Sequence, residues 1–168
     1  TAGRGRLGRA WHSPFGENIY LSLKYSFAKD VSELSGLSLV LGLAVCDAIE
    51  AEAIALLDSD PSPLPAFLLL AQSHWHHGVI GIVAARLVER YQRPAALLAS
   101  DSDGLMRASV RAPEGFAVDQ ALQHCTALLE RHGGHPAAGG FTVRISAVSA
   151  LHEALNGLAE DWLRHRGD

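Results

Sequence analysis

The stretch "AFLLLAQSHWHHGVIGIVAARLVERYQRPAALLA", residues 66–99, decides the fold. It holds two short, uniformly apolar runs, 66–71 and 95–99, of the kind that forms strands buried on both faces of a sheet. Residues 79–92, between these runs, have the apolar spacing of a helix. A strand, a helix and a second strand in this order predict a right-handed parallel crossover.

The residues downstream continue the same pattern. Hydrophobic periodicity separates further strands and helices there, with turns rich in glycine and aspartate between them. The predicted elements are a strand at 105–111, a helix at 116–132 that stops at Gly133 and Gly134, a strand at 140–145 and a helix at 147–165. The sequence therefore predicts an α/β fold, a mixed β-sheet with flanking helices.

The N-terminal part has a different pattern of predicted elements from the α/β unit. Residues 1–17 read as a loop of glycine, arginine and proline, and 18–27 alternate apolar and polar side chains like a half-buried strand. Asp30 and Glu33 have capping-box spacing before an apolar helical pattern that runs to about Leu57. Three prolines then interrupt the chain before the α/β unit. We predict two parts, an incomplete fragment at 1–50 and a domain at 51–168, that meet within one helix near residues 46–52.

Composition bounds the function. The chain has 168 residues, 48% of them hydrophobic, and a net charge of −4, so a nucleic-acid site must be a local basic patch. Cys46 and Cys125 lie in apolar helical patterns, which indicates buried thiols and a reducing, cytoplasmic setting. No charged-then-apolar leader is present, and the apolar run 36–49 is shorter than the about 20 residues that span a bilayer.

Three side chains of the strand at 105–111 suit phosphate. Arg107, Ser109 and Arg111 follow one another at every second residue, so they project from one face of a strand. Two guanidinium groups beside a hydroxyl can bind adjacent phosphates. The alternative is the solvated outer face of an edge strand.

Two histidine clusters flank this strand in the sequence. His74, His76 and His77 precede the helix at 79, whose free N–H groups favour an anion, and a metal site there is a weaker alternative because no cysteine or carboxylate lies close in sequence. Trp75 is either core or a platform for base stacking. His135 follows the paired glycines and is predicted to lie in a turn that lets a ligand approach the backbone, or else to be an exposed residue after a helix end.

These motifs together resemble one family. "WHHGVIGIVAARL", "RASVRAPEGFAVDQAL" and "LLERHGGHPAAGGFTV" resemble the C-terminal DHHA1 domain of RecJ-type single-strand DNA exonucleases, members of the DHH phosphoesterase superfamily, over about 48–168. Gly139 departs mildly from this pattern, since the family often has alanine there. The residues that the resemblance assigns to phosphate binding are His76, Arg86, Arg107, Ser109, Arg111, Gly134 and His135.

The resemblance does not extend to catalysis. In that family the metal-binding aspartates and the Asp-His-His motif lie in a separate domain, which holds two Mn²⁺ or Mg²⁺ ions. No Asp-His-His sequence occurs in these 168 residues. The resemblance therefore implies binding without hydrolysis, with no catalytic residue and no resident metal.

A second resemblance covers the N-terminus. "TAGRGRLGRAWHSPFGENIYLSL", residues 1–23, resembles the ligand-binding loop and following strand of biotin–protein ligases, which use biotin and ATP. By that resemblance Arg6 and Arg9 would contact biotinyl-adenylate, with Gly3 and Gly5 allowing close backbone approach. The ligand-binding lysine of that family has no counterpart, because the two lysines of this chain lie at other positions.

Three hypotheses follow. The first is a module that binds single-stranded DNA or short oligonucleotides; the second is a recombined or engineered chimera without a selected activity. The third is a remnant that binds biotin or an adenylate. No membrane partner is expected, and the apolar segment 18–57 predicts a homodimer or a segment-swapped oligomer unless it packs on the α/β unit.

Overall fold

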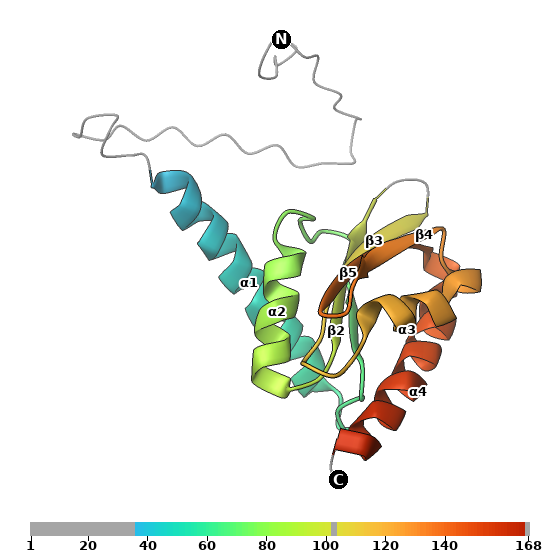
Figure 1. Cartoon of the computed structure of the whole chain (residues 1–168). Helices are drawn as coiled ribbons and strands as arrows, with labels where there is room; N and C mark the ends of the chain where they lie inside the picture. The colour runs from blue at the N-terminus through green and yellow to red at the C-terminus, as the bar shows by residue number, and fades with distance from the viewer. Residues whose placement is uncertain (1–35, 102–103, 167–168) are drawn as a thin grey trace, which may run out of the picture. The chain divides into compact units, whose positions relative to one another are not determined.

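A computed structural model of the chain describes residues 36–101 and 104–166 (Figure 1). The loop predicted at 1–17, the strand at 18–27 and the Asp30–Glu33 capping box lie outside these residues. The strands are β1 (Leu68–Ala71), β2 (Ala95–Ser100), β3 (Leu105–Arg111), β4 (Arg131–His135) and β5 (Ala138–Arg144). The helices are α1 (Leu37–Ser59), α2 (Ile80–Tyr91), α3 (Val118–His124) and α4 (Val148–Arg166), with 3₁₀ turns η3 (Thr126–Leu128) and η4 (Ile145–Ala147).

The strands form one mixed sheet in the order β1-β2-β3-β5-β4. β1 and β2 are parallel, with Leu68 opposite Ala95, and α2 connects them. The remaining pairs are antiparallel. The predicted crossover and mixed sheet are therefore confirmed, and the run 95–99 is buried throughout, as a strand covered on both faces should be.

Helices cover the two faces of the sheet, and each face has its own apolar core. On one face Leu68 and Leu97 pack with the buried side chains of α1 and α2. On the other face Phe141 and Val143 pack with α3 and α4 (Figure 1). Because successive residues of a strand point to opposite faces, β2 supplies both cores, with Leu97 in the first and Leu98 in the second.

The helix predicted at 116–132 is wrong in its second half. α3 ends at His124, η3 follows, and residues 131–135 form β4. Gly133 and Gly134 pair with Gly140 and Gly139 of β5 instead of ending a helix. A Cβ on Gly134 would lie 2.5 Å from the Ala138 carbonyl oxygen, so this hairpin needs glycine there.

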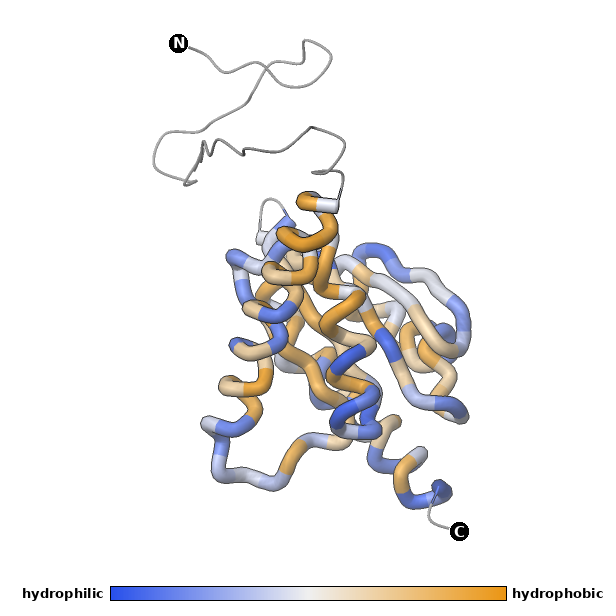
Figure 2. Tube along the Cα trace, turned by 90° about the vertical axis from the view of Figure 1, so that its left-hand side faces the viewer, coloured by the Kyte–Doolittle hydropathy of each residue, from blue (hydrophilic) through white to orange (hydrophobic). Residues whose placement is uncertain are grey.

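α1 is one helix that runs through the predicted junction at 46–52. Cys46, Ile49 and Ala53 are buried against the rest of the fold, and Cys46 and Cys125 are free, buried thiols as predicted. Upstream of Cys46, α1 shows apolar side chains to solvent, visible at its N-terminal end in Figure 2. These exposed residues are Leu37, Leu39, Val40, Leu41, Leu43 and Val45. Among the helices described, none has the length and hydropathy to cross a membrane.

Candidate nucleic-acid interface

The central strand β3 presents its polar side chains on one face, as predicted. Met106, Ala108 and Val110 are buried in the core of α3 and α4, so the alternate residues Arg107 and Ser109 lie on the α2 side of the sheet. β3 pairs with β2 on one side and β5 on the other. β3 is therefore not an edge strand, although Arg107 on this face is exposed to solvent.

Register extends this face across three strands. Directly paired residues of antiparallel strands lie on the same face, so each residue of β3 begins a row that continues through β5 to β4. The three rows are Arg107–Thr142–Arg131, Ser109–Gly140–Gly133 and Arg111–Ala138–His135. We call these nine residues the polar sheet face.

The α2 helix borders the polar sheet face. A Cβ on Gly81 would lie 3.1 Å from Arg111 Nη2 and 3.4 Å from Ser109 Oγ, so this helix approaches both side chains closely. Arg111 Nη1 donates a hydrogen bond to the Val110 carbonyl oxygen at 2.7 Å. Arg111 is thus half-buried and held in place, which lowers the entropy that it would lose on binding an anion.

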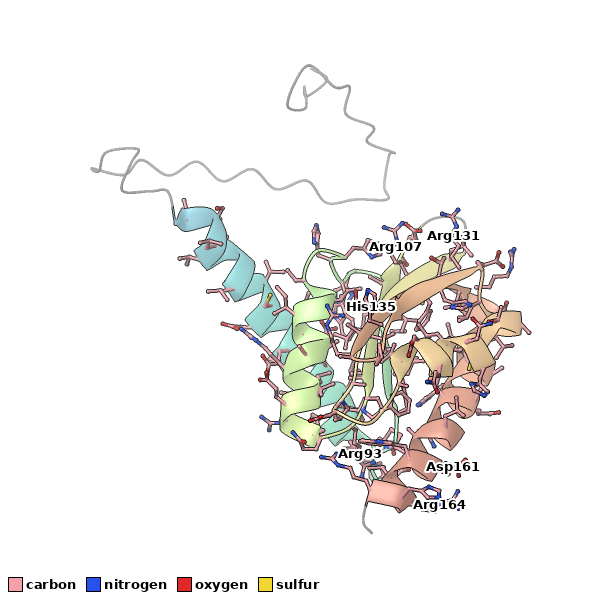
Figure 3. All side chains as sticks on the ribbon, in the orientation of Figure 1. Arg93, Arg107, Arg131, His135, Asp161 and Arg164 are labelled. Carbon is pink, nitrogen blue, oxygen red and sulfur yellow. The ribbon has the colours of Figure 1, made fainter. Side chains whose placement is uncertain are left out.

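His135 ends β4 in an exposed position, in the row of Arg111. The prediction of a turn is corrected to the last residue of a strand, followed by Pro136 and Ala137 before β5. Figure 3 shows Arg107 and Arg131 near one end of the sheet and His135 nearer its middle. Gly134 alternates to the opposite face, and its contact with Ala138 gives it a structural place in the hairpin.

The histidines before α2 have separate environments. His76 is exposed, and its Nδ1 accepts a hydrogen bond from the Gly78 N–H at 3.0 Å. In a neutral ring this leaves the proton on Nε2, where it can be donated to a ligand. His77 Nε2 donates to the Ser100 carbonyl oxygen at 2.7 Å, and the buried His77 Nδ1 has no partner within the described residues. The described residues contain no group of three side chains placed to hold a metal ion.

Trp75 is core, so the base-stacking alternative is wrong. The side chain is 3% exposed, and its Nε1 donates to Glu52 Oε2 at 2.9 Å. His74 Nε2 lies 3.0 Å from the same oxygen. The hydrogen bond from Trp75, and then that from His74, hold the pKa of the Glu52 carboxyl below its ordinary value. These contacts join α1 to the loop before α2.

Arg86 lies between helices and not on the polar sheet face. Its Nη1 donates to Asp47 Oδ1 at 2.6 Å and to Glu50 Oε2 at 2.7 Å, both on α1. These two carboxylates, Asp47 foremost, raise the pKa of Arg86 above its ordinary value. Because the guanidinium already has two anionic partners on α1, Arg86 is not part of the phosphate site that we propose.

Sequence reasoning missed Arg131 and Thr142. Arg131 falls in the predicted end of a helix, and Thr142 falls in a predicted strand to which no binding residue was assigned. The paired strands bring both residues beside Arg107, where the three line a hollow of about 230 Å³. The repeated register through β5 is the signal that finds them. The residues expected to contact biotinyl-adenylate (Gly3, Gly5, Arg6 and Arg9) lie outside the described residues.

Comparisons with known proteins give two family matches. Residues 64–161, more than half of the chain, match the DHHA1 domain, and residues 1–66 match the biotin/lipoate A/B protein ligase family. The bifunctional ligase/repressor BirA of Salmonella typhimurium is 46% identical over 48 residues, which cover 29% of this chain and 15% of BirA. Both predicted resemblances are confirmed.

Relatives of the larger part include single-stranded-DNA-specific exonucleases. The single-stranded-DNA-specific exonuclease RecJ of Bacillus subtilis is 38% identical over 97 residues, 57% of this chain and 12% of that protein. The crystal structure of Thermus thermophilus RecJ with Mn²⁺ matches with a TM-score of 0.65 and 29% identity, over 78% of this chain and 19% of that one. The chain thus spans a small part of these relatives' length. By its fold and by the match over more than half of its residues, the chain belongs to the DHHA1 domain family.

Proposed function

We propose that this chain binds single-stranded nucleic acid, DNA foremost, by holding its phosphate backbone on the polar sheet face. The observation that carries the proposal is the register, which places Ser109 and Arg111 of the central strand on the same face as His135, in the row of Arg111. A guanidinium fork, a hydroxyl and an imidazole are all hydrogen-bond donors to phosphate oxygens. Arg107 adds a second positive charge on the same strand.

Glycines on the face support the approach of a strand. A Cβ on Gly133 would meet no atom within 4 Å, and Gly140 beside it lacks a side chain as well. The middle row of the face is therefore bare backbone next to Ser109. A phosphodiester chain can lie against such a row, between side chains that flank it.

The charge balance also favours a local site. The whole chain carries −4, so non-specific attraction over its entire surface is not expected. Binding should depend on the few cations of the polar sheet face and should weaken steeply with salt.

Fluorescence anisotropy with a labelled single-stranded oligodeoxynucleotide tests the proposal. We expect micromolar affinity at low salt, and a clear loss in the Arg107→Ala/Arg111→Ala variant. The matched control, Arg90→Ala/Arg164→Ala, removes two exposed arginines from helices outside the face.

Equal affinity of the two double variants would contradict the assignment of the face. A wild-type chain that melts cooperatively but binds no oligonucleotide would instead support a folded chimera without a selected activity. Thermal melts of all variants separate lost contacts from lost folding.

A further inference from the structure

The end of the polar sheet face that holds Arg107 also carries hydrogen-bond donors suited to phosphate, as does the end that holds Arg111 and His135. Arg107 of β3 is paired with Thr142 of β5, and Thr142 is paired with Arg131 of β4. Adjacent strands lie about 4.8 Å apart, so the two arginines flank the hydroxyl at a separation of roughly 10 Å between their backbones. Two guanidinium forks with a hydroxyl between them suit a phosphate.

A hollow lies between these side chains. Arg107, Arg131 and Thr142 line a space of about 230 Å³, and Gly140 contributes to it without a side chain. The Arg107 side chain is 55% exposed, and Arg131 is exposed on the edge strand. A ligand from solvent can therefore reach both guanidinium groups without any rearrangement of the sheet.

The charges around the hollow are unequal. Asp101 Oδ2 lies 3.3 Å from Arg107 Nη2 and neutralises part of its charge. Glu130 Oε1 is bound to Arg144 Nε at 2.7 Å. Among the residues that the structure describes, no ion pair includes Arg131.

We propose that Arg107, Thr142 and Arg131 form a second phosphate subsite. The subsite rests on the proposed function, because it takes a further phosphate of the same strand that occupies Ser109, Arg111 and His135. Arg107 and Arg111 are four residues apart, roughly 13 Å along the strand. A ligand that fills both subsites must therefore extend over more than two neighbouring phosphates.

The subsite predicts that affinity depends on oligonucleotide length in a way that Arg131 controls. Unlabelled deoxythymidine oligomers of two, four and eight nucleotides would compete against a labelled octamer bound to the full chain. We expect Arg131→Met to weaken the octamer about threefold to tenfold and to reduce the slope of affinity against salt by about 0.7, the share of one phosphate. The dinucleotide should lose less than twofold in affinity, because it fits within the first subsite, which Ser109, Arg111 and His135 form.

Three further variants make the test specific. Thr142→Val keeps a branched side chain on the strand but removes the hydroxyl, and should weaken only the longer oligomers. Arg131→Lys should retain part of the affinity for the octamer. Arg164→Met removes the same charge from α4, near the opposite end of the described fold from Arg131 (Figure 3). It should leave the affinity for oligomers of all three lengths unchanged.

The outcomes separate the subsite from the proposed function. If Arg131→Met weakens the octamer no more than Arg164→Met does, the subsite is refuted, while a loss in Ser109→Ala would still support the face. Equal losses at all three lengths would also overturn it, because Arg131 would then belong to the first subsite. A wild-type chain that binds no oligomer overturns both proposals.

Discussion

Asp101 Oδ2 lies 3.3 Å from Arg107 Nη2, so a carboxylate of the β2–β3 turn competes for an arginine of the proposed interface. Both side chains reach solvent, and exposed pairs of this kind contribute about 0.2–1 kcal/mol. We expect Asp101→Asn to raise the affinity for single-stranded DNA about twofold to fivefold, since it frees the guanidinium and removes a repulsive charge. Anisotropy titrations at low and moderate salt would measure the change.

Asp161 supplies the control for that variant. It pairs with Arg164 on α4, so Asp161→Asn makes the same charge change away from the polar sheet face. An equal gain in both variants would indicate a general charge effect and count against the role of Arg107.

A side chain at Gly139 should destabilise the fold by crowding α3. A Cβ there would lie 2.8 Å from Val118 Cγ1 and 3.1 Å from Leu122 Cδ1, where α3 packs against β5, and 3.0 Å from the Gly133 carbonyl oxygen. We expect Gly139→Ala to lower the free energy of unfolding by about 1–3 kcal/mol through overpacking, measured by urea denaturation. Gly133→Ala, which points into open space, should have a much smaller effect.

A compensating variant sharpens this prediction. Val118→Ala makes room beside β5, so Gly139→Ala should cost less in that background than in the wild type. Strict additivity of the two changes would show that the contact with Val118 is not the cause.

The Glu52 carboxyl should make stability depend on acid pH. Hydrogen bonds from Trp75 and His74 lower its pKa in the folded state below the ordinary value of 4.5. The unfolded chain then binds protons more readily, so this contribution is present above about pH 4.5 and is lost as the pH falls through the folded pKa. Between pH 7 and pH 3 the urea midpoint of Glu52→Gln should fall less than that of the wild type. An equal fall in both proteins would argue against the contact.

Exposed and buried positions of α1 should respond differently to substitution. Leu39 and Leu43 are 72% and 53% exposed, so Leu39→Gln/Leu43→Gln should change the free energy of unfolding by less than about 1 kcal/mol. Ile49 is 7% exposed, and Ile49→Ala should cost about 2–4 kcal/mol. A large loss in the first variant would mean that another surface covers this part of the helix in solution, as the predicted oligomer requires.

The sequence predicted those strands and helices in which apolar and polar residues alternate regularly or in which all residues are apolar. β3 begins and ends where predicted, because Met106, Ala108 and Val110 alternate with polar residues. Its three polar residues could likewise be assigned to one face. The central position of β3 could not be predicted, since strand order depends on pairing between distant segments.

β4 could not be predicted from its own residues. Arg131–His135 contains two glycines and no apolar alternation, and its pairing with β5 is what makes it a strand. The missed residue Arg131 belongs to this element. Trp75 and Arg86 also needed the structure, because their partners on α1 lie more than twenty residues away in the sequence.

The pairing of the short edge strand β4 determines whether its charged side chains lie on the same face as the arginines of β3. Side chains alternate along it, so a shift of its pairing by one residue would turn Arg131 and His135 toward α3 and α4. A shift in one direction would bring His135 into the place of Gly134, where a Cβ meets the Ala138 carbonyl oxygen at 2.5 Å. The need for glycine at position 134 therefore disfavours this one-residue shift of the register. Arg131 and His135 can share a surface with Arg107 and Arg111 only while the five residues of β4 keep this register with β5.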